Sequence, residues 1–319
     1  MGGAQLKTDF WVYEYITPWD YYAHGVSRVL ACRKTAYQEM YIVESGSYGK
    51  ALVLDGKWQS CTVDEYLYHE PLVHPAMLLQ GHPRRVLILG GGEGATAREV
   101  LRWKSVERAV MVDIDGEVVE ACREHLPEMH RQAFDDPRLE VVIGDALEYL
   151  ERSDRTWDVI ISDLSDPIED GPSFKLFTKE YFELARGALA DDGVFVLQAG
   201  PVSPVDLSLH ARLARTMGAV FDHVQSYVTY VPSYAAPWSL VLGSARPIDS
   251  RPDPDVTDRR LAECTTGGLR MFDGTTLLGL MYIQGHLRRA IRDETRLFTM
   301  KEPPKFFGRC LAESPTPAT

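Results

Sequence analysis

The sequence predicts an α/β protein in which a doubly wound, mostly parallel sheet follows a small N-terminal antiparallel β-lobe. Runs of Val, Ile and Leu bounded by turn signals are typical of buried parallel strands. Four such runs each end in a glycine-rich turn or a carboxylate: Val86 to Ala95, Ala109 to Asp115, Leu139 to Ala146 and Trp157 to Pro167. Helical segments alternate with these runs, which favours right-handed crossovers between parallel strands.

The first 62 residues are predicted to form strands. Tyr37 to Glu44 alternates with roughly period two, and Lys50 to Leu54 is a short apolar run. An Asp55-Gly56 turn before Lys57 to Cys61 is a hairpin signal. These features predict an antiparallel lobe rather than part of the parallel sheet.

The pattern becomes helical from Val63 to Gln80. Asp64 is a candidate N-cap, because its carboxylate can accept hydrogen bonds from the first backbone N–H groups. Pro71 and Pro75 are expected to kink or interrupt this helix, since proline lacks an N–H and clashes with the preceding turn.

The remaining elements complete the predicted sheet. Candidate helices are Ala95 to Trp103, Gly116 to His125, Ala146 to Glu151, Thr178 to Leu189, Pro204 to Met217 and Thr275 to Ile291. Val194 to Gln198 is a fifth strand, Val220 to Val231 and Trp238 to Gly243 form a closing antiparallel hairpin, and Ser244 to Asp258 is a loop. We therefore expect a β-lobe over residues 1–62, a Rossmann-like catalytic domain over 63–300 and a C-terminal tail over 301–319.

Bulk composition excludes some partners. The net charge of −12, from 34 basic and 46 acidic residues, disfavours nucleic acid and anionic membranes. Five scattered cysteines without a CxxC pair indicate reduced thiols in a cytoplasmic protein. No apolar run is long enough to predict a membrane span.

Five acids are expected to converge on one rim of the sheet. Ligands of an open parallel sheet bind beyond the carboxyl ends of its strands. The acids that follow predicted strands are Glu93, Asp113, Asp145, Asp163 and Asp166. Their convergence predicts a ligand rich in positive charge.

The loop after the first parallel strand predicts a nucleoside site. Gly90 and Gly92 belong to a G-x-G-x-x-A pattern that opens a helix, and Asp113 lies 19 residues beyond Gly94 at the end of the next strand. A carboxylate there typically accepts hydrogen bonds from two ribose hydroxyls. The alternative is a tight turn without a ligand.

Asp145 and Ala146 follow the third strand of this series. The Asp145 carboxylate could accept from an adenine amino group while the Ala146 amide donates to a ring nitrogen. Alternatively, Asp145 is only the N-cap of the next helix.

Glu93 discriminates between nucleoside ligands. A pyrophosphate about 4 Å away would be repelled by about 4 kcal/mol at an effective dielectric of about 20, which argues against NAD. Decarboxylated S-adenosylmethionine carries a sulfonium and an ammonium and has no carboxylate, so Glu93 suits its tail. The alternative for Glu93 is a solvent-facing acid that complements a helix dipole.

Asp163 and Asp166 frame the expected chemistry. A neutral amine would attack the methylene next to the sulfonium, with Asp163 as its base and Asp166 as the anchor of the amine chain. The alternative is a pair of Asx turns. Tyr68, Tyr230, Tyr234 and Trp238 could line an amine tunnel through cation–π contacts. His69 and His74 lie in HEPLVH, which is not the HExxH of zinc enzymes, so no metal is expected.

Taken together, these residues resemble the polyamine aminopropyltransferases. The matching stretches are Tyr37-Gln38, Asp55-Gly56 with Gln59, Asp64 to Glu70, GGGEGAT, VDID, GDA, DLSDP and YVPSYAAPW. The resemblance implies a catalytic base at Asp163, a donor site of Gln38, His69, Gly90, Gly92, Glu93, Asp113, Asp145 and Ala146, and an acceptor site of Gln59, Tyr68, Asp166 and Tyr234. It implies decarboxylated S-adenosylmethionine as co-substrate without a further cofactor, and a homodimer or homotetramer.

Departures from the family pattern favour particular members. Leu164 and Glu93 replace a serine and an aspartate of the diamine-using spermidine synthases, as in thermospermine synthases. Asp293 to Thr299 with Phe306-Phe307-Gly308 also looks most like the plant-type thermospermine enzyme, and the small residues of SYAAPW favour a longer acceptor. The expected acceptor is therefore spermidine. The alternatives are putrescine or agmatine as acceptor, a methyltransferase using intact S-adenosylmethionine, and a non-catalytic polyamine sensor.

Overall fold

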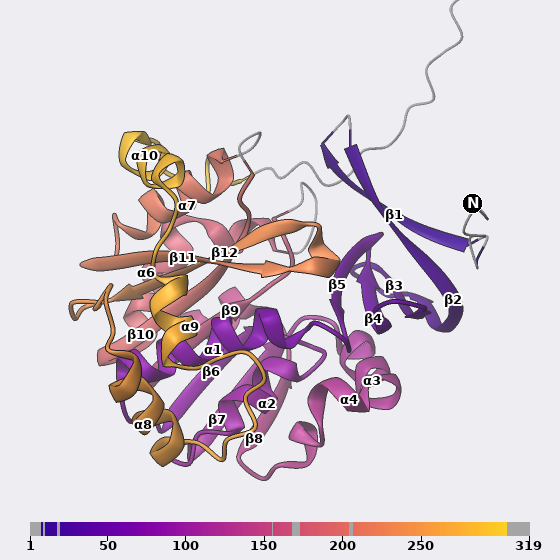
Figure 1. Cartoon of the computed structure of the whole chain (residues 1–319), viewed down its shortest axis with the longest axis horizontal. Coiled ribbons are helices and arrows are strands. Elements are labelled where there is room, and N and C mark those ends of the chain that lie inside the picture. Colours follow the sequence, from indigo (N-terminus) through magenta and orange to yellow (C-terminus); the bar gives the residue numbers. More distant parts are fainter. Residues whose placement is uncertain are drawn as a thin grey trace, which may run out of the picture.

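The computed structural model describes residue 8 and residues 10–17, 20–154, 156–167, 173–203 and 207–304. The first three residues of the helix expected from Pro204, the Phe306-Phe307-Gly308 motif and most of the predicted tail lie outside this part of the chain. The described strands form two sheets, a smaller one near the N-terminus and a larger one that carries the helices (Figure 1).

The smaller sheet is the predicted antiparallel lobe. Its strands lie in chain order: β1 (Phe10–Thr17), β2 (Asp20–Lys34), β3 (Glu39–Ser45), β4 (Gly49–Leu54) and β5 (Lys57–Cys61). The turn between β4 and β5 is the predicted Asp55-Gly56 pair, with φ of 48° and 76°. Both residues are left-handed, which matches the twist of a tight hairpin and favours Asp-Gly there.

The larger sheet has the order β11-β12-β10-β9-β6-β7-β8. Its strands are β6 (Arg85–Gly90), β7 (Arg108–Asp113), β8 (Leu139–Ile143), β9 (Trp157–Asp163), β10 (Leu189–Pro201), β11 (His223–Val231) and β12 (Ala236–Ser244). Strands β10, β9, β6, β7 and β8 are parallel, and β12 pairs antiparallel with both β10 and β11. The chain reverses direction across the sheet between β6 and β9, so this is the switch point where such folds bind ligands.

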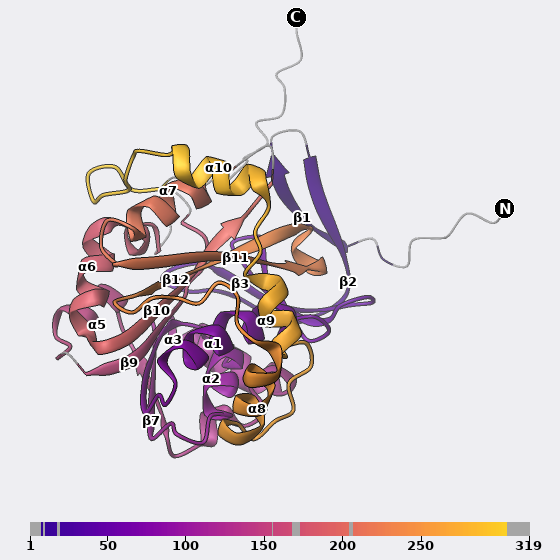
Figure 2. The same ribbon diagram turned by 60° about the vertical axis from the view of Figure 1, so that its left-hand side comes forward.

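Helices cover both faces of the larger sheet (Figure 2). They are α1 (Tyr66–Gln80), α2 (Ala95–Leu101), α3 (Gly116–His125), α4 (Pro127–His130), α5 (Ala146–Glu151), α6 (Lys179–Ala188), α7 (Ser208–Met217), α8 (Pro254–Cys264), α9 (Gly274–Leu280) and α10 (Gly285–Asp293), with short 3-10 turns η1 (Ala133–Asp135), η2 (Phe174–Phe177) and η3 (Pro232–Tyr234). Alternate strand residues face opposite cores, so Ile88 packs with α1, α2, α8 and α9, whereas Leu87 packs with α5, α6 and α7.

The expectation for the first helix was partly wrong. Helix α1 begins at Tyr66, and Asp64 does not cap it, because its carboxylate accepts from the Ser233 backbone N–H at 2.8 Å. The helix also continues through Pro71 and Pro75.

Two hydroxyl groups of β11 explain why the prolines are tolerated. Pro71 and Pro75 cannot bond the carbonyls of Leu67 and Pro71, four residues before them. The Thr229 hydroxyl donates to the Leu67 carbonyl at 2.8 Å, and the Tyr227 hydroxyl donates to the Pro71 carbonyl at 2.9 Å. Both orphaned carbonyls are therefore satisfied by the sheet.

The C-terminal elements were also misplaced. The expected loop Ser244 to Asp258 contains the start of α8, where Asp253 caps the helix and Pro254 is its first residue. The expected helix from Thr275 to Ile291 is two helices, α9 and α10, separated after Leu280. The Asp273 side chain caps α9, but no side chain caps the start of α10, so no capping residue marked the break between the two helices.

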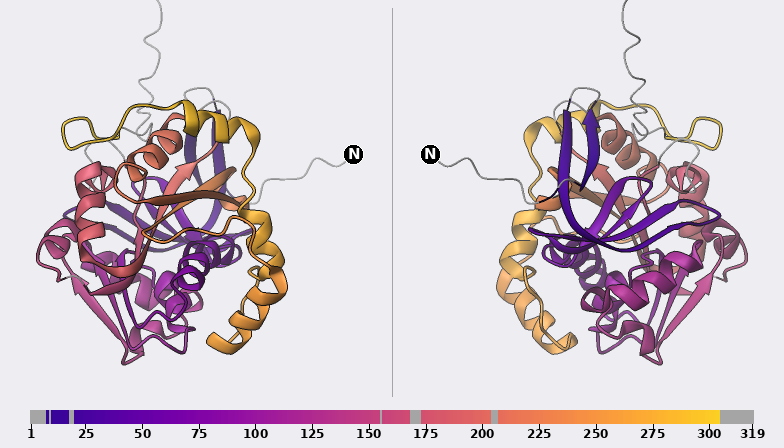
Figure 3. Two further views of the ribbon diagram at one scale, coloured as in Figure 1. Left: turned by 90° about the vertical axis from the view of Figure 1, so that its left-hand side faces the viewer. Right: turned by 90° about the vertical axis from the view of Figure 1, so that its right-hand side faces the viewer.

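The lobe is packed against helix α3. Met40, Ile42 and Leu52 form one buried cluster with Val118 and Cys122. Strands β1 and β2 lie at the outer edge of the lobe (Figure 3). Among the described residues, no helix combines the length and the apolar character needed to cross a bilayer.

Candidate active site

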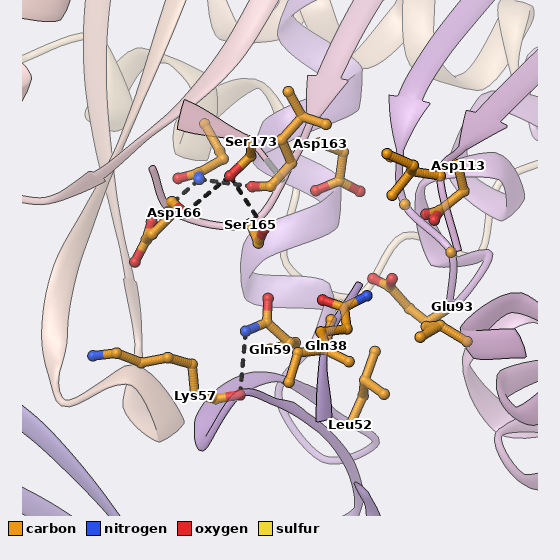
Figure 4. A pocket seen from close by; sticks show the side chains of 18 of the residues that line it. Gln38, Leu52, Lys57, Gln59, Glu93, Asp113, Asp163, Ser165, Asp166 and Ser173 are labelled. Atoms are coloured by element: carbon orange, nitrogen blue, oxygen red, sulfur yellow. Dashed lines mark hydrogen bonds between the residues drawn. The ribbon is translucent and has the colours of Figure 1, made fainter. Parts of the chain in front are cut away.

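A pocket lies between the carboxyl ends of the parallel strands and the β-lobe (Figure 4). The sequence-predicted site residues that line it are Gln38, Gln59, Tyr68, Gly90, Gly92, Glu93, Asp113, Asp145, Ala146, Asp163, Asp166 and Tyr234. His69 is the exception, because it lies behind Glu93 and contacts that side chain instead of the pocket. The sheet therefore brings all five predicted acids to one cavity.

The glycine loop lets the backbone reach the centre of this pocket. Gly90 has φ of 83°, and a Cβ there would collide with the carbonyl oxygen of Asp163 on the neighbouring strand. A Cβ on Gly92 would lie 2.8 Å from Oδ2 of Asp113. Larger residues at these positions would close the gap between β6, β7 and β9, which is why the loop requires glycine.

Asp113 lines the pocket and is held by a backbone hydrogen bond. Its Oδ1 accepts from the Asp115 backbone N–H at 2.9 Å. Burial, opposed by that hydrogen bond and reinforced by Glu93 and Asp163, raises the pKa of Asp113 to about 6. The Gln38 side chain from the lobe donates to Asp115 at 3.0 Å, so the lobe is tied to the helix that begins beside Asp113.

Asp145 is the N-cap of α5, and it also lines the pocket. Its Oδ1 accepts from the backbone N–H groups of Leu147 at 2.7 Å and Glu148 at 3.4 Å. The two interpretations left open by the sequence are therefore compatible. One oxygen caps the helix while the residue forms part of the cavity wall.

Glu93 is not the solvent-facing acid of the alternative interpretation. It is 8% exposed, and its Oε1 accepts from His69 Nε2 at 2.8 Å. Desolvation alone would lower the pKa of His69, but hydrogen bonds to Glu65 and Glu93 raise that pKa to about 10. Glu93 thus presents a buried carboxylate beside a fixed cation.

Asp163 is held by two hydroxyl groups from distant elements. Tyr68 of α1 donates to Oδ1 at 2.7 Å, and Thr96 of α2 donates to Oδ2 at 2.6 Å. Burial and Glu93 raise the pKa of Asp163, while His69 and the two hydroxyls oppose this rise. A carboxylate with a raised pKa is a better proton acceptor than an exposed one.

Gln198 links Asp166 to the aromatic residues of the pocket. Gln198 Nε2 donates to Asp166 Oδ1 at 3.3 Å, and Gln198 Oε1 accepts from Trp238 Nε1 at 3.0 Å. The rings of Tyr234 and Trp238 lie 4.8 Å apart, and the Tyr234 hydroxyl donates to the Gln59 carbonyl. Tyr68, Tyr234 and Trp238 therefore form the expected aromatic wall.

One prediction about this end of the pocket was wrong. Tyr230 is 58% exposed and does not line the cavity, because alternation along β11 turns it outward. Ala235 and Ala236 do not line the cavity either, and the prediction that the small residues of SYAAPW leave room for a longer acceptor stays a prediction.

Sequence reasoning missed Lys57, Glu14 and Gln198, which also line the pocket. Lys57 Nζ forms an ion pair with Glu14 Oε1 at 3.4 Å, and both side chains are at most 16% exposed. Figure 4 shows the Lys57 side chain extending toward Asp166. Period-two alternation puts Lys57 and Gln59 on one face of β5, a signal that could have found Lys57.

One group of residues has metal-ligating atoms close together. Ligand atoms of His69, Glu93 and Asp163 lie within 4.8 Å of one another. However, Nδ1 of His69 lies 2.8 Å from the Glu65 carbonyl and Nε2 lies 2.8 Å from Glu93. Both partners only accept, so both ring nitrogens carry protons and neither can ligate a cation.

The fold and the pocket define an α/β protein with an acidic cavity at the switch point of its parallel sheet, and the charge of that cavity suits a cationic ligand. The family described as "Spermine/spermidine synthase domain" matches residues 65–248, and the "Spermidine synthase tetramerisation domain" matches residues 10–62. The chain belongs to the spermine/spermidine synthase family and is a polyamine aminopropyltransferase.

Curated relatives and solved structures are similar over nearly the whole chain. A polyamine aminopropyltransferase of Synechococcus sp. (strain JA-2-3B'a(2-13)) is 57% identical over 94% of this chain and 98% of its own. The polyamine aminopropyltransferase of Aeropyrum pernix is 44% identical over the same shares. The crystal structure of spermidine synthase from Thermotoga maritima has a TM-score of 0.81 and 30% identity, covering 91% of this chain and 97% of that chain. A spermidine synthase in complex with the transition state analogue AdoDATO has a TM-score of 0.82 at the same identity and coverage.

Proposed function

We propose that the protein transfers the aminopropyl group of decarboxylated S-adenosylmethionine to spermidine, giving thermospermine and methylthioadenosine. Asp163 is the proposed base. The proposed donor residues are Gln38, His69, Gly90, Gly92, Glu93, Asp113, Asp145 and Ala146, and the proposed acceptor residues are Gln59, Tyr68, Asp166 and Tyr234. No cofactor takes part, since the sulfonium supplies its own leaving group.

The buried carboxylate of Glu93 is the observation that carries the donor assignment. It lies on the pocket wall with Asp113 and Asp163, so a ligand there meets three acids. The carboxylate of intact S-adenosylmethionine would be repelled by them, whereas an aminopropyl ammonium would be attracted. This selects the decarboxylated donor and argues against a methyltransferase.

The chemistry is a direct displacement. The acceptor ammonium loses a proton to Asp163, and the free amine attacks the carbon next to sulfur. The C–N bond forms as the C–S bond breaks, and the electron pair of that bond stays on sulfur to give a neutral thioether. Tyr68 and Thr96 hold Asp163 in one orientation, which supports alignment of the amine with the reacting carbon.

Two further carboxylates support a triamine as acceptor. Asp166 and Glu14 both line the pocket, and Leu164 lines it between the two aspartates. If one nitrogen of spermidine attacks, its two remaining ammonium groups can each find a carboxylate. Attack through the aminopropyl end would give thermospermine.

Lys57 favours a second candidate, transfer to putrescine. Its ammonium already pairs with Glu14. A diamine leaves only one ammonium to place, and Asp166 can bind it without competing with Lys57. A third ammonium would have to share Glu14 with the lysine.

Separation of products decides between these acceptors. Purified protein is incubated with decarboxylated S-adenosylmethionine and putrescine, agmatine or spermidine, and the amines are resolved against thermospermine and spermine standards. Thermospermine as the product with the highest kcat/KM supports the proposal, and spermidine formed from putrescine supports the second candidate. Turnover with intact S-adenosylmethionine, or methylthioadenosine binding without any turnover, would refute both.

We also propose that the chain assembles through its β-lobe into a homodimer or homotetramer. Phe10, Tyr13 and Tyr21 of the outer strands are each 49% to 60% exposed, and the rings of Tyr13 and Tyr21 lie 5.3 Å apart, so these strands offer aromatic surface to a partner. Light scattering after gel filtration gives the assembled mass. A monomeric mass at micromolar concentration would contradict this proposal.

A further inference from the structure

A series of buried charged side chains, joined by hydrogen bonds, runs from the pocket into the interface between α1 and α2. It begins at Glu93, whose carboxylate lies 2.8 Å from His69 Nε2. His69 Nδ1 lies 3.0 Å from Glu65, and Glu65 receives two hydrogen bonds from Arg98, at 2.8 and 3.1 Å. Arg98 Nε in turn donates to Glu99 at 2.7 Å.

These groups are almost completely removed from water. The exposed fractions are 0% for His69 and Glu99, 2% for Glu65 and 7% for Arg98. Burying an ion pair costs several kcal/mol per ion before attraction and hydrogen bonds repay it. A hydrophobic interface between the two helices would avoid that cost. We therefore expect this series of charged side chains to have a function at its pocket end.

The backbone fixes the protonation of His69. Nδ1 lies 2.8 Å from the carbonyl oxygen of Glu65, and a carbonyl can only accept, so Nδ1 carries a proton. In a neutral ring with its proton on Nδ1, the unprotonated Nε2 would face the Glu93 carboxylate. Two hydrogen-bond acceptors would then face each other without a proton between them. His69 can donate to Glu93 only as a cation.

We propose that Glu65 and Arg98, which do not reach the pocket, are positioning residues: they hold His69 as a cation, and the cation holds Glu93 in place for the ammonium of the donor. Arg98 keeps Glu65 ionised and aimed at His69. Burial alone would raise the pKa of Glu65, but His69 and Arg98 lower this pKa to about 2. The inference depends on the proposed function only for the identity of the donor.

Charged and titratable groups approach His69 from several elements. They are Glu65 directly before its helix and Tyr68 on that helix, Glu93 in the loop after β6, Arg98 of α2 acting through Glu65, and Asp163 at the end of β9. Glu65 and Arg98 can be neutralised without altering a residue that lines the pocket, because Tyr68, Glu93 and Asp163 all line it. Of these two, Glu65 contacts His69 directly.

The variant Glu65→Gln tests the proposal. Glutamine keeps the shape and the backbone carbonyl at Nδ1, but it removes the charge, so the ring will lose its proton at lower pH than in the wild type. We expect the KM for decarboxylated S-adenosylmethionine to rise by about tenfold between pH 7 and 9, the cost of one charged hydrogen bond. The wild-type KM stays flat over this range because the pKa of His69 is about 10.

The control variant is Glu107→Gln. Glu107 also receives two hydrogen bonds from one arginine, Arg84, at 2.8 and 2.9 Å, but both side chains are exposed at the surface. Its donor KM should follow the wild type at every pH. Methylthioadenosine, which lacks the ammonium, should bind Glu65→Gln as tightly as the wild type.

Two results would overturn the inference. One is a Glu65→Gln enzyme with a lower melting temperature whose KM for decarboxylated S-adenosylmethionine does not change with pH. The series of charged side chains would then have a structural role only. The other needs no turnover. It is a nitrogen NMR spectrum of 15N-histidine-labelled wild-type protein in which His69 is neutral at pH 8, with the variant His69→Asn used only to assign the signal. If Glu65→Gln does not fold, this spectrum decides the proposal. If the wild-type protein does not transfer an aminopropyl group, the proposed function is refuted. The NMR measurement of the His69 charge can still be made in that case.

Discussion

Replacing Glu93 by glutamine separates two ligands that differ by one ammonium. Glu93 is 8% exposed, so its charge acts in a poorly solvated site. Two unit charges about 4 Å apart interact by about 4 kcal/mol at an effective dielectric of about 20. His69, 2.8 Å from Glu93, neutralises part of this field. Taking half the interaction leaves about 2 kcal/mol, or about thirtyfold in affinity for the donor.

Steady-state kinetics measures the KM for the donor, and calorimetry measures the Kd of methylthioadenosine. We expect Glu93→Gln to raise the KM for decarboxylated S-adenosylmethionine about thirtyfold and to change the Kd of methylthioadenosine less than about threefold. Glutamine still accepts a hydrogen bond from His69, so the loop should keep its conformation. An equal loss of affinity for both ligands would mean that Glu93 only supports the loop. The assignment of the donor would then lose its main argument.

Other substitutions and conditions test the remaining roles. Asp163→Asn should lower kcat by at least about a hundredfold, measured as methylthioadenosine release, and an unchanged rate would remove Asp163 as the base. Because burial among acids raises the pKa of Asp113 to about 6, its protonated form should bind ribose less well. The affinity for methylthioadenosine should then be constant above that pH and fall below it in calorimetry from pH 5 to 8, whereas a flat profile would contradict the ribose contact. Lys57→Met should lower the KM for spermidine about tenfold relative to putrescine, and equal changes for both amines would show that Lys57 does not meet the third nitrogen.

The sequence predicted that the residues of the proposed donor half line one pocket, because these residues follow strand ends. Asp113 and Asp163 each end a buried strand of the parallel sheet, whereas Asp145 follows β8, an edge strand that is only partly buried. The geometry of such a sheet brings these strand ends to one edge. The glycine loop added Glu93 to the same edge. No long-range information was needed to place these groups together.

The parts that failed depend on contacts between distant segments. The prolines of α1 are tolerated because hydroxyls of Tyr227 and Thr229 bond the orphaned carbonyls, and these residues lie more than 150 positions away. Asp64 was misassigned as a cap because Ser233, across the chain, takes its carboxylate. Local patterns weigh only the nearest donors, so they assigned the local role in each case.

The proposed acceptor half of the pocket lies at the interface between the two sheets. Lys57 and Gln59 come from the lobe, while Asp166 and Trp238 come from the larger sheet, so the distances between them depend on how the sheets dock. That docking is set by the buried contacts of the lobe with α3 and by the bond from Tyr234 to the Gln59 carbonyl. A shift of the lobe would move the Lys57 ammonium relative to Asp166 without altering any donor contact on the strand ends. With the proposed roles, substitutions in the lobe can change the choice of acceptor while the chemistry at the sulfonium stays the same, so the motifs at the strand ends define the family more sharply than they define the acceptor amine.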